Sequence, residues 1–295
     1  MAGRFGDAGL DSPRVVAELL LCQVLGCERM DLYMQADRPA SQGERDNLRP
    51  LVVRVLAGEP VQYVVGRRWF YTRQFEVDRS TMIPQPSTED LVSAVLSWLG
   101  REGSESDGGE DASRRPTVRI ADVGTGSGCI AVTLASERPE LEVLATDLSE
   151  GALALARRNA RRHGVAERIT FAHGRLLEPV GASAASAGAR FDVICSNPPY
   201  ISDREWEEGQ VEASVREYVP AAALRGGSEG LDCIGPLIEG AGGVLRAGGL
   251  LALEIGHGQR DAVLELARAA GLQQRRVLKD TDGFWRVLLA ETRAD

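Results

Sequence analysis

Short apolar runs alternate with helix-forming segments from residue 118 to residue 291, and this order limits the chain to few folds. Alternating strands and helices build a parallel sheet whose crossovers are right-handed. The apolar runs that predict strands are residues 118–124, 141–147, 168–174, 191–197, 250–256, 273–280 and 284–291. Only the turn at residues 281–283 separates the last two runs, which predicts a hairpin. We therefore predict an α/β fold with a doubly wound, mostly parallel seven-stranded sheet and an antiparallel edge hairpin.

The chain before this region follows other patterns. Residues 12–58 have helical spacing and begin with Pro13, which is favoured at the first position of a helix. Residues 59–78 are rich in Val and aromatic side chains, which favours a strand pair. A further helix is expected to end at Gly100. The predicted units are a small helical N-terminal domain (1–60), a hairpin linker (61–85) and a sheet domain (86–295).

Two segments lack the apolar pattern. Residues 101–117 are acidic, rich in Gly and Ser and without a large apolar side chain, which predicts a disordered insertion. Residues 180–189 consist mostly of Ala, Gly and Ser, and we expect a loop there.

Composition narrows the functional classes. The net charge of −9 argues against a protein that grips duplex DNA through its phosphates. The five cysteines form no Cys-x-x-Cys pair and no metal-ligand spacing with the three histidines, so we predict no metal site and reduced thiols. The N-terminus has no apolar signal-peptide core and no early run long enough for a bilayer. We expect a cytoplasmic protein without membrane contact.

The segment Asp122–Gly128, DVGTGSG, lies between a predicted strand and a predicted helix. Its three glycines, Gly124, Gly126 and Gly128, allow the backbone to turn sharply and to approach a ligand closely. No lysine accompanies them, so the loop is poorly suited to a triphosphate. An ordinary tight turn remains the alternative at this point.

The next predicted strand ends at Asp147, where a carboxylate commonly accepts hydrogen bonds from a ribose diol. Asp147 could instead cap the following helix, but Ser149 can take that role. Together with the glycines, Asp147 predicts a nucleoside ligand.

A third motif, Asn197–Tyr200 or NPPY, ends the fourth predicted strand of the sheet. Both prolines fix φ, so the turn is stiff and its carbonyl groups have set directions. The side-chain oxygen of Asn197 and the carbonyl of Pro198 can accept both hydrogens of a planar –NH₂ group, and Tyr200 offers a flat face to it. Such a site suits a poor nucleophile that must be oriented toward an electrophile. A structural turn is the alternative for the motif alone.

These motifs resemble S-adenosylmethionine-dependent methyltransferases that modify planar –NH₂ groups. The segments EPVQYVVGRRWF, MIPQPSTEDLV, GSEGLD and GGLLALEIG are similar to the protein-glutamine methyltransferases of the PrmC (HemK) type, over roughly residues 55–290. The resemblance implies S-adenosylmethionine as cofactor, and as substrate the glutamine side-chain amide in the Gly-Gly-Gln tip of class 1 peptide-chain release factors. It also implies that the helical domain (1–60) recognises the substrate.

The resemblance assigns the site residues as follows. The implied cofactor contacts are Asp122, Gly124, Thr125, Gly126, Ser127, Gly128, Asp147, Leu176 and Asn197. The implied substrate contacts are Asn197, Pro198, Pro199 and Tyr200, of which Asn197, Pro198 and Tyr200 are the catalytic candidates. Two positions depart from the family pattern, because Gln85 replaces an arginine and Arg175 replaces an acidic residue that commonly contacts the adenine.

Three other functions stay open from the sequence. The chain could methylate a glutamine of a ribosomal protein, or it could bind the cofactor without turnover. Adenine-amine DNA methyltransferases also use NPPY, but they need a basic groove and a target-recognition domain for a flipped base. The acidic composition and the lack of a basic-aromatic segment argue against the DNA methyltransferase alternative.

Overall fold

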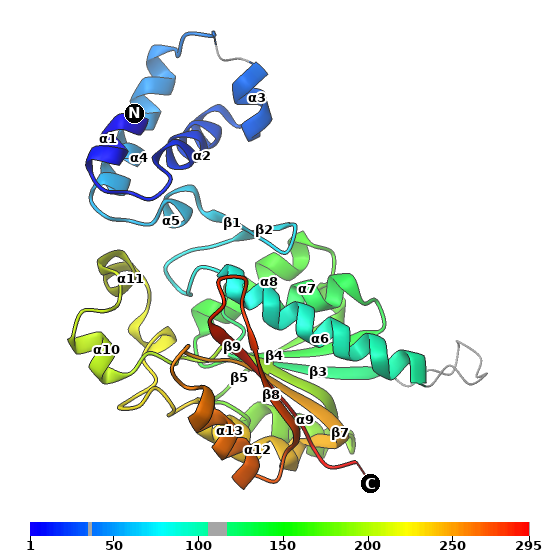
Figure 1. Cartoon of the computed structure of the whole chain (residues 1–295). Coiled ribbons are helices and arrows are strands. Elements are labelled where there is room, and N and C mark those ends of the chain that lie inside the picture. The colour runs from blue at the N-terminus through cyan, green and yellow to red at the C-terminus, as the bar shows by residue number, and fades with distance from the viewer. Residues whose placement is uncertain (35–36, 106–116, 295) are drawn as a thin grey trace.

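A computed structural model describes residues 1–34, 37–105 and 117–294. Figure 1 shows a helical unit at the N-terminal end, then a two-stranded hairpin, then a large sheet with helices on both faces. The helices α10 (Asp203–Glu207) and α11 (Ala213–Tyr218) lie beside the sheet, below the N-terminal unit (Figure 1).

The N-terminal unit packs its helices around a small apolar core that includes Phe5, Leu20 and Val55. Its helices are α1 (Ala2–Asp7), α2 (Pro13–Leu25), α3 (Arg29–Met34), α4 (Gln42–Leu56) and α5 (Val61–Val65). Residues 61–65 were expected to be extended, because they are rich in Val. They form a helical turn instead, since Pro60 starts the turn and Gly66 ends it in the left-handed conformation.

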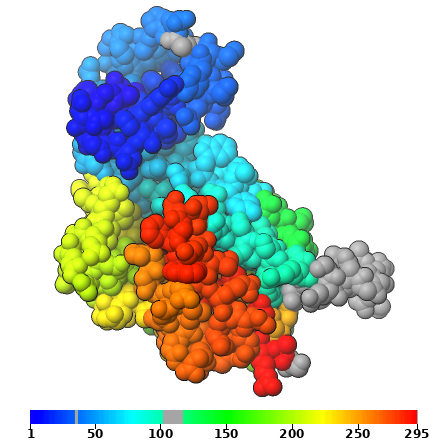
Figure 2. Space-filling model, in the orientation of Figure 1, coloured from blue at the N-terminus to red at the C-terminus, as the bar shows by residue number. Residues whose placement is uncertain are grey.

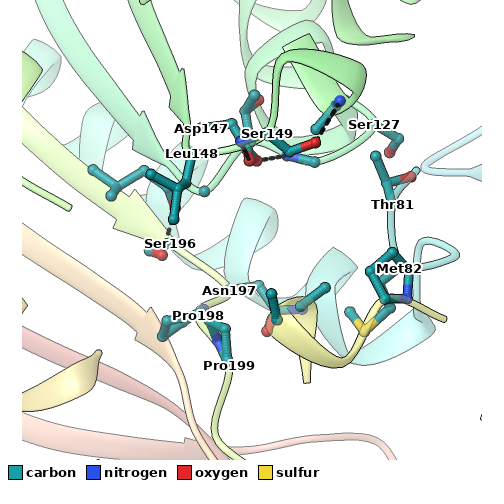
Figure 3. Close-up of a pocket in the computed structure, with 18 of the residues that line it drawn as sticks. Thr81, Met82, Ser127, Asp147, Leu148, Ser149, Ser196, Asn197, Pro198 and Pro199 are labelled. Carbon is teal, nitrogen blue, oxygen red and sulfur yellow. Dashed lines mark hydrogen bonds between the residues drawn. The ribbon is translucent and has the colours of Figure 1, made fainter. Parts of the chain in front are cut away.

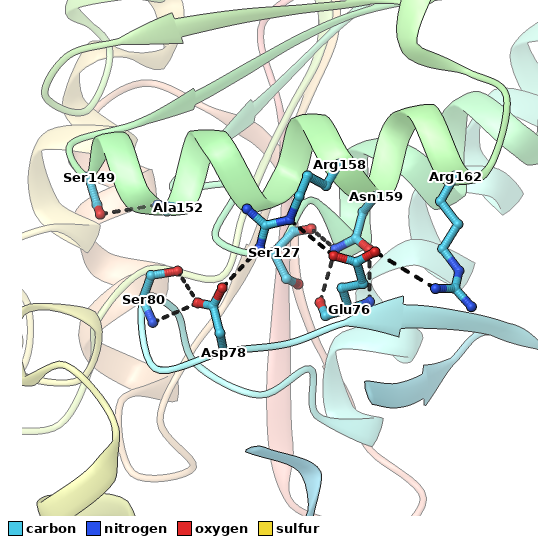
Figure 4. Close-up of polar contacts among 9 residues, drawn as sticks. All are labelled: Glu76, Asp78, Ser80, Ser127, Ser149, Ala152, Arg158, Asn159 and Arg162. Atoms are coloured by element: carbon cyan, nitrogen blue, oxygen red, sulfur yellow. Dashed lines mark hydrogen bonds and ion pairs between the residues drawn. The ribbon is translucent and has the colours of Figure 1, made fainter. Parts of the chain in front are cut away.

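The hairpin consists of β1 (Arg67–Phe70) and β2 (Arg73–Glu76), which pair antiparallel as predicted. Figure 4 shows how polar contacts fix β2 to α8 (Glu150–Arg162). The fully buried Asn159 accepts from the backbone N–H of Glu76 at 2.8 Å and donates to its carbonyl at 3.0 Å. Arg158 pairs with Glu76 and Asp78, each at 3.0 Å. The hairpin is therefore bonded directly to the sheet unit.

The large sheet has the order β5-β4-β3-β6-β7-β9-β8. Its strands are β3 (Val118–Val123), β4 (Leu141–Asp147), β5 (Ile169–His173), β6 (Phe191–Ser196), β7 (Leu245–Glu254), β8 (Gln273–Lys279) and β9 (Trp285–Glu291). Strands β3 to β7 are parallel, and β9 lies antiparallel between β7 and β8. The predicted seven-stranded sheet with its antiparallel edge hairpin is confirmed.

Alternate residues of each central strand pack into different cores. Along β6, Val193 and Cys195 face one core, and Ile194 faces the other. The first core contains α6 and α7, and the second contains α12 and α13. The helices of this unit are α6 (Pro86–Glu105), α7 (Cys129–Glu137), α8, α9 (Glu178–Ala187), α10 (Asp203–Glu207), α11 (Ala213–Tyr218), α12 (Ile234–Val244) and α13 (Arg260–Ala269), with short 3₁₀ turns at Ala166–Arg168 and Ala221–Ala223. The two-sided burial explains why the strands are apolar runs.

Two sequence predictions about these helices were wrong. Residues 180–187 of the expected loop (180–189) are helical and form most of α9, because Ala is the best helix former and Gly188 ends the helix. Val180 anchors this helix in the second core. Helix α6 continues past Gly100 to Glu105, so the beginning of the expected disordered insertion is helical. Residues 106–116 of that insertion lie outside the described residues.

The N-terminal unit also contacts the segment before β7. Tyr63 of α5 lies in an apolar cluster with Val77, Val219 and Leu224. In Figure 2 the N-terminal unit (blue) sits above α10 and α11 (yellow and yellow-green) at one end of the molecule. This contact places the helical unit near the carboxyl ends of the parallel strands, where such folds bind ligands.

Candidate active site

A cavity of about 510 Å³ opens at the carboxyl ends of β3, β4, β5 and β6. The strand order changes direction between β3 and β6, and ligands of doubly wound sheets bind at such a point. Figure 3 shows Asp147 on one side of the cavity, Asn197 and its prolines on another, and Thr81 and Met82 on a third. The volume lies within the ~300–1,000 Å³ that is usual for small-molecule sites.

The glycine loop, residues 124–128, connects β3 to α7. All three of its glycines have positive φ, which most side chains disfavour. A side chain at Gly128 would also place its Cβ 3.0 Å from the Cβ of Ala156 on α8. Four loop residues line the cavity, namely Gly124, Thr125, Gly126 and Ser127, whereas Gly128 packs behind them.

Asp122 lies beneath this loop and does not line the cavity. Its Oδ2 accepts hydrogen bonds from Thr125 Oγ1 at 2.7 Å and from the N–H of Ala131 at 3.1 Å. Burial raises the pKa of Asp122 to about 7, although these two hydrogen bonds oppose the shift. These hydrogen bonds join Asp122 to the glycine loop and to the start of α7.

Asp147, at the end of β4, lines the cavity. Its carboxylate accepts from the backbone N–H of Gly126 at 2.9 Å and from that of Ser149 at 2.8 Å. Ser149 caps α8 by accepting from the N–H of Ala152, so Asp147 is not the cap. Two backbone donors thus fix the carboxylate in the wall of the cavity (Figure 3).

The NPPY turn follows β6. Since β3 lies between β4 and β6, the glycine loop stands between this turn and Asp147. Asn197, Pro198 and Pro199 of the turn line the cavity. Ser196 donates from Oγ to the carbonyl of Val123 at 2.5 Å, which joins the ends of β6 and β3. The side-chain nitrogen of Asn197 donates to Thr88 Oγ1 at 3.0 Å. In the part of the chain that the structure describes, Asn197 Oδ1 accepts no hydrogen bond.

Tyr200 lies away from the cavity wall. Its hydroxyl donates to Glu254 Oε1 at 3.4 Å, and its ring packs against the second core. Burial raises the pKa of Tyr200 well above its usual value, and the Glu254 carboxylate beside it acts in the same direction. The role of its ring as a face for the substrate stays a prediction.

The end of the cavity near β5 is formed by residues that follow this strand. Leu176 lines the cavity with φ of 47°, an unfavourable angle for a branched side chain. Arg175 and Cys233 lie there too, and burial raises the pKa of the Cys233 thiol while the guanidinium of Arg175 opposes the rise. Backbone strain of this kind is concentrated at active sites and ligand-binding sites, where the surrounding structure fixes the angle.

Several lining residues escaped the sequence analysis, notably Thr81, Met82 and Thr88. Thr81 is 2% exposed, and its Oγ1 has no hydrogen-bond partner among the described residues. The carbonyl of Thr81 accepts from the hydroxyl of Tyr63 in α5 at 2.6 Å. Met82 and Thr88 lie in the segment MIPQPSTEDLV that carries the family resemblance, but only the folded chain brings these residues to the cavity.

Comparison with known proteins assigns the family. Residues 1–66 match the PrmC N-terminal domain, and residues 111–223 match the methyltransferase small domain. A protein of Geobacter sulfurreducens named release factor glutamine methyltransferase is 38% identical over 97% of this chain and 92% of its own length. The chain belongs to the release factor glutamine methyltransferase family. A relative of the same name from Moorella thermoacetica is also 38% identical, over 99% of this chain and 96% of its own length. The family that the short motifs predicted is thereby confirmed.

Solved structures share the fold of this family member. The N-terminal domain of human METTL16, in complex with SAH, matches 75% of this chain and 76% of that chain, with a TM-score of 0.52 and 18% identity. A methyltransferase of Pyrococcus furiosus matches 83% of this chain and 98% of that chain, with a TM-score of 0.50 and 19% identity. At this level of identity the two matches support the fold alone.

Among the residues that the structure describes, no helix is both long and apolar enough to cross a membrane. No group of three or more His, Cys, Asp or Glu side chains within residues 1–34, 37–105 and 117–294 could hold a metal ion.

Proposed function

We propose that this chain transfers a methyl group from S-adenosylmethionine to the side-chain amide nitrogen of the glutamine in the Gly-Gly-Gln motif of class 1 release factors. Membership of the release factor glutamine methyltransferase family supports the reaction. One structural observation supports the site most strongly: a fixed carboxylate, Asp147, and a fixed amide, Asn197, line the same cavity.

The residues around Asp147 fit the cofactor. The Asp147 carboxylate at the end of β4 suits a ribose diol, and the backbone of Gly124–Ser127 lines the cavity, where a ligand can approach it closely. Leu176 supplies an apolar surface for a purine ring. The orphaned hydroxyl of Thr81 is a further hydrogen-bonding group that a ligand in the cavity can satisfy.

The residues around Asn197 fit a planar amide. Asn197 Oδ1 is open to the cavity side of the turn, since the nitrogen of the same side chain is bonded to Thr88. Asn197 Oδ1 and the carbonyl of Pro198 accept the two hydrogens of the substrate –NH₂ group, and the two prolines keep both acceptors in place.

For this reaction the protein mainly has to orient the amide nitrogen toward the methyl group. When bound, S-adenosylmethionine supplies a methyl group on a positively charged sulfur, which leaves as a neutral thioether as the new C–N bond forms. Asn197 and Pro198 hold the amide nitrogen in line with that methyl group. Their oxygens would also stabilise the positive charge that develops on the nitrogen, which would then lose one proton to solvent water. Correct orientation can lower such a barrier by ~7–11 kcal/mol in favourable cases.

The proposed partner is a protein, and the helical unit of residues 1–60 is proposed to recognise it. This unit exposes Met30, Tyr33 and Met34 on α3, apolar side chains of a kind that protein partners cover. Because the proposed substrate is a translation factor, we place the protein in the cytoplasm. The cysteines of the described chain are all free thiols, in keeping with a reducing compartment.

Mass spectrometry tests the proposal directly. Purified release factor is incubated with the protein and S-adenosylmethionine, and the Gly-Gly-Gln peptide is examined for the mass of one added methyl group. Ribosomal proteins and adenine-containing DNA are treated in parallel. Methylation of that glutamine, lost in Asn197→Ala, is the expected result. If only a ribosomal protein or the DNA were methylated, release factors would not be the substrate and the proposal would be wrong.

A further inference from the structure

A buried carboxylate lies behind the NPPY turn. Glu254 is the last residue of β7 and is 0% exposed. Its Oε2 accepts from Thr88 Oγ1 at 2.7 Å, and its Oε1 accepts from Ser87 Oγ at 2.9 Å. The hydroxyl of Tyr200 reaches the same Oε1 at 3.4 Å. One carboxylate therefore receives three hydroxyl groups from two distant segments of the chain.

Removing a carboxylate from water costs free energy, so a fully buried glutamate is unusual unless it has a role. Burial raises the pKa of Glu254, while the hydrogen bonds from Thr88 and Ser87 oppose the shift. Ser87 and Thr88 belong to the first turn of α6, and the positive end of that helix favours a nearby anion. The net direction of the pKa shift is upward, but three hydroxyl groups donate to the two carboxyl oxygens, so in the structure this side chain is a hydrogen-bond acceptor toward Ser87, Thr88 and Tyr200.

The same network continues to the cavity. Thr88 is 2% exposed and joins Glu254 to Asn197, because its Oγ1 also accepts from Asn197 Nδ2 at 3.0 Å. A threonine hydroxyl has one proton to donate. When that proton is given to Glu254, the oxygen can only accept from Asn197, and this draws the –NH₂ end of the amide to Thr88. Asn197 Oδ1 is then left for the substrate.

We infer that Glu254 is a positioning residue, which acts through Thr88 to set the direction of the Asn197 amide and which holds Tyr200 at the other end of the same turn. The inference rests on the proposed function. An asparagine amide can turn by half a rotation at little steric cost, because its oxygen and nitrogen have nearly the same size. A turned Asn197 would present a donor to the substrate –NH₂ group, and no hydrogen bond could form. The hydrogen bond from Thr88 to Glu254 prevents this, because it leaves the Thr88 oxygen only as an acceptor toward Asn197.

Glu254→Gln tests the inference with little change in size. A glutamine can present either its oxygen or its nitrogen to Thr88, so the direction of the Asn197 amide is no longer fixed. We expect kcat for methyl transfer to fall by ~10²-fold, as a small misplacement of a reacting group can cause. The Kd for S-adenosylmethionine, measured by calorimetry, should stay at the value of the unmodified protein.

Variants of Thr88 separate positioning from packing. Thr88→Val keeps the shape but removes the hydroxyl, so it should reproduce the loss of kcat in Glu254→Gln. Thr88→Ser keeps a hydroxyl and should recover most of the activity. The double variant Glu254→Gln/Thr88→Val should be no slower than the worse single variant, because both changes break one connection. Normal kcat in either Glu254→Gln or Thr88→Val overturns the inference.

A matched control comes from the neighbouring strand. Glu291 ends β9 and accepts from the indole N–H of Trp98 at 3.1 Å, far from the NPPY turn in sequence and outside the cavity lining. Glu291→Gln removes the same charge from the same sheet and should leave kcat unchanged.

A spectroscopic measurement decides the inference without any turnover. The side-chain –NH₂ signals of Asn197 are assigned by their loss in Asn197→Ala, with S-adenosylhomocysteine present. We expect one proton that is shifted and protected from solvent in the unmodified protein, and loss of that protection in Glu254→Gln and Thr88→Val. Unchanged signals in both variants overturn the inference. If the unmodified protein does not methylate the release factor, the proposed function fails, while these signals still test the amide direction.

Discussion

Asn159 on α8 donates a hydrogen bond from its side-chain nitrogen to the carbonyl of Ser127 in the glycine loop, and the two atoms lie 2.8 Å apart. The same side chain bonds both backbone groups of Glu76 in the hairpin (Figure 4). One buried amide therefore joins the hairpin, the helix and the loop that lines the cavity.

Asn159→Ala should destabilise the protein and weaken cofactor binding together. The change removes the hydrogen bond to the buried carbonyl of Ser127 and two part-buried bonds to Glu76, which costs about 2–3 kcal/mol of the free energy of unfolding. Urea denaturation measures the loss, and calorimetry measures the Kd for S-adenosylmethionine.

Arg158→Ala is the matched control on the same helix. Its ion pairs with Glu76 and Asp78 are partly exposed, so the expected loss is under about 1 kcal/mol. Equal effects of the two variants would show that the buried hydrogen bonds of Asn159 contribute no more to stability than a partly exposed ion pair.

Asp147→Ala should weaken cofactor binding more than it lowers the rate at saturating cofactor. A hydrogen bond to a charged group contributes about 1.5–3 kcal/mol, which corresponds to roughly a 10- to 150-fold rise in the Kd for S-adenosylmethionine. Titration calorimetry gives the Kd. Glu150→Gln, which removes an exposed charge from the first turn of α8, should leave the Kd unchanged. A larger fall in kcat than in affinity would contradict the assignment of Asp147.

Asn197→Ala should have the opposite profile. Without the side-chain oxygen the substrate amide loses one of its two acceptors, so kcat should fall by at least ~10²-fold, while the Kd for the cofactor changes less. Single-turnover methylation of release factor, followed by mass spectrometry, measures the chemical step. Near-normal turnover would refute the orientation mechanism.

Asp122 should make stability depend on pH. Its folded pKa of about 7 lies above the ordinary value, so ionised Asp122 is disfavoured in the folded protein. Its contribution is fully present below about pH 4 and is lost as the pH rises through about 7, by up to about 4 kcal/mol. Asp122→Asn should therefore unfold with a flatter pH profile than the unmodified protein, as measured by thermal melts across this range.

The control for this effect is Asp261→Asn on α13, whose side chain is 87% exposed. It should retain the pH profile of the unmodified protein. Identical slopes for Asp122→Asn and the unmodified protein would mean that the Asp122 carboxyl is not protonated on folding.

Local patterns in the sequence predicted the parts of the site that local geometry determines. The glycines at 124, 126 and 128 are needed for positive φ, and Asp147 and Asn197 follow buried strands, so strand order alone brings them together. Residues 180–187 were missed as a helix, because a run of Ala, Gly and Ser has little amphipathic pattern.

The remaining parts depend on contacts between distant segments. Glu254 and Thr88 are 166 residues apart in the chain, and each is consistent with an unrelated local role at a strand end or a helix start. The expected contact of Asp122 with the cofactor stays a prediction, whereas its burial beneath the loop follows from the packing of α7, which the motif does not encode. Only the folded arrangement separates a ligand contact from the group that supports it.

The position of β9 has a consequence for how the chain is made. Glu254 pairs with Val287 of β9, and β9 also completes the pairing of β8. During synthesis β7 therefore leaves the ribosome before its neighbour exists, and its edge stays open until residues 285–291 emerge. The strand that ends in Glu254 reaches its final setting only when nearly all of this sequence has been translated.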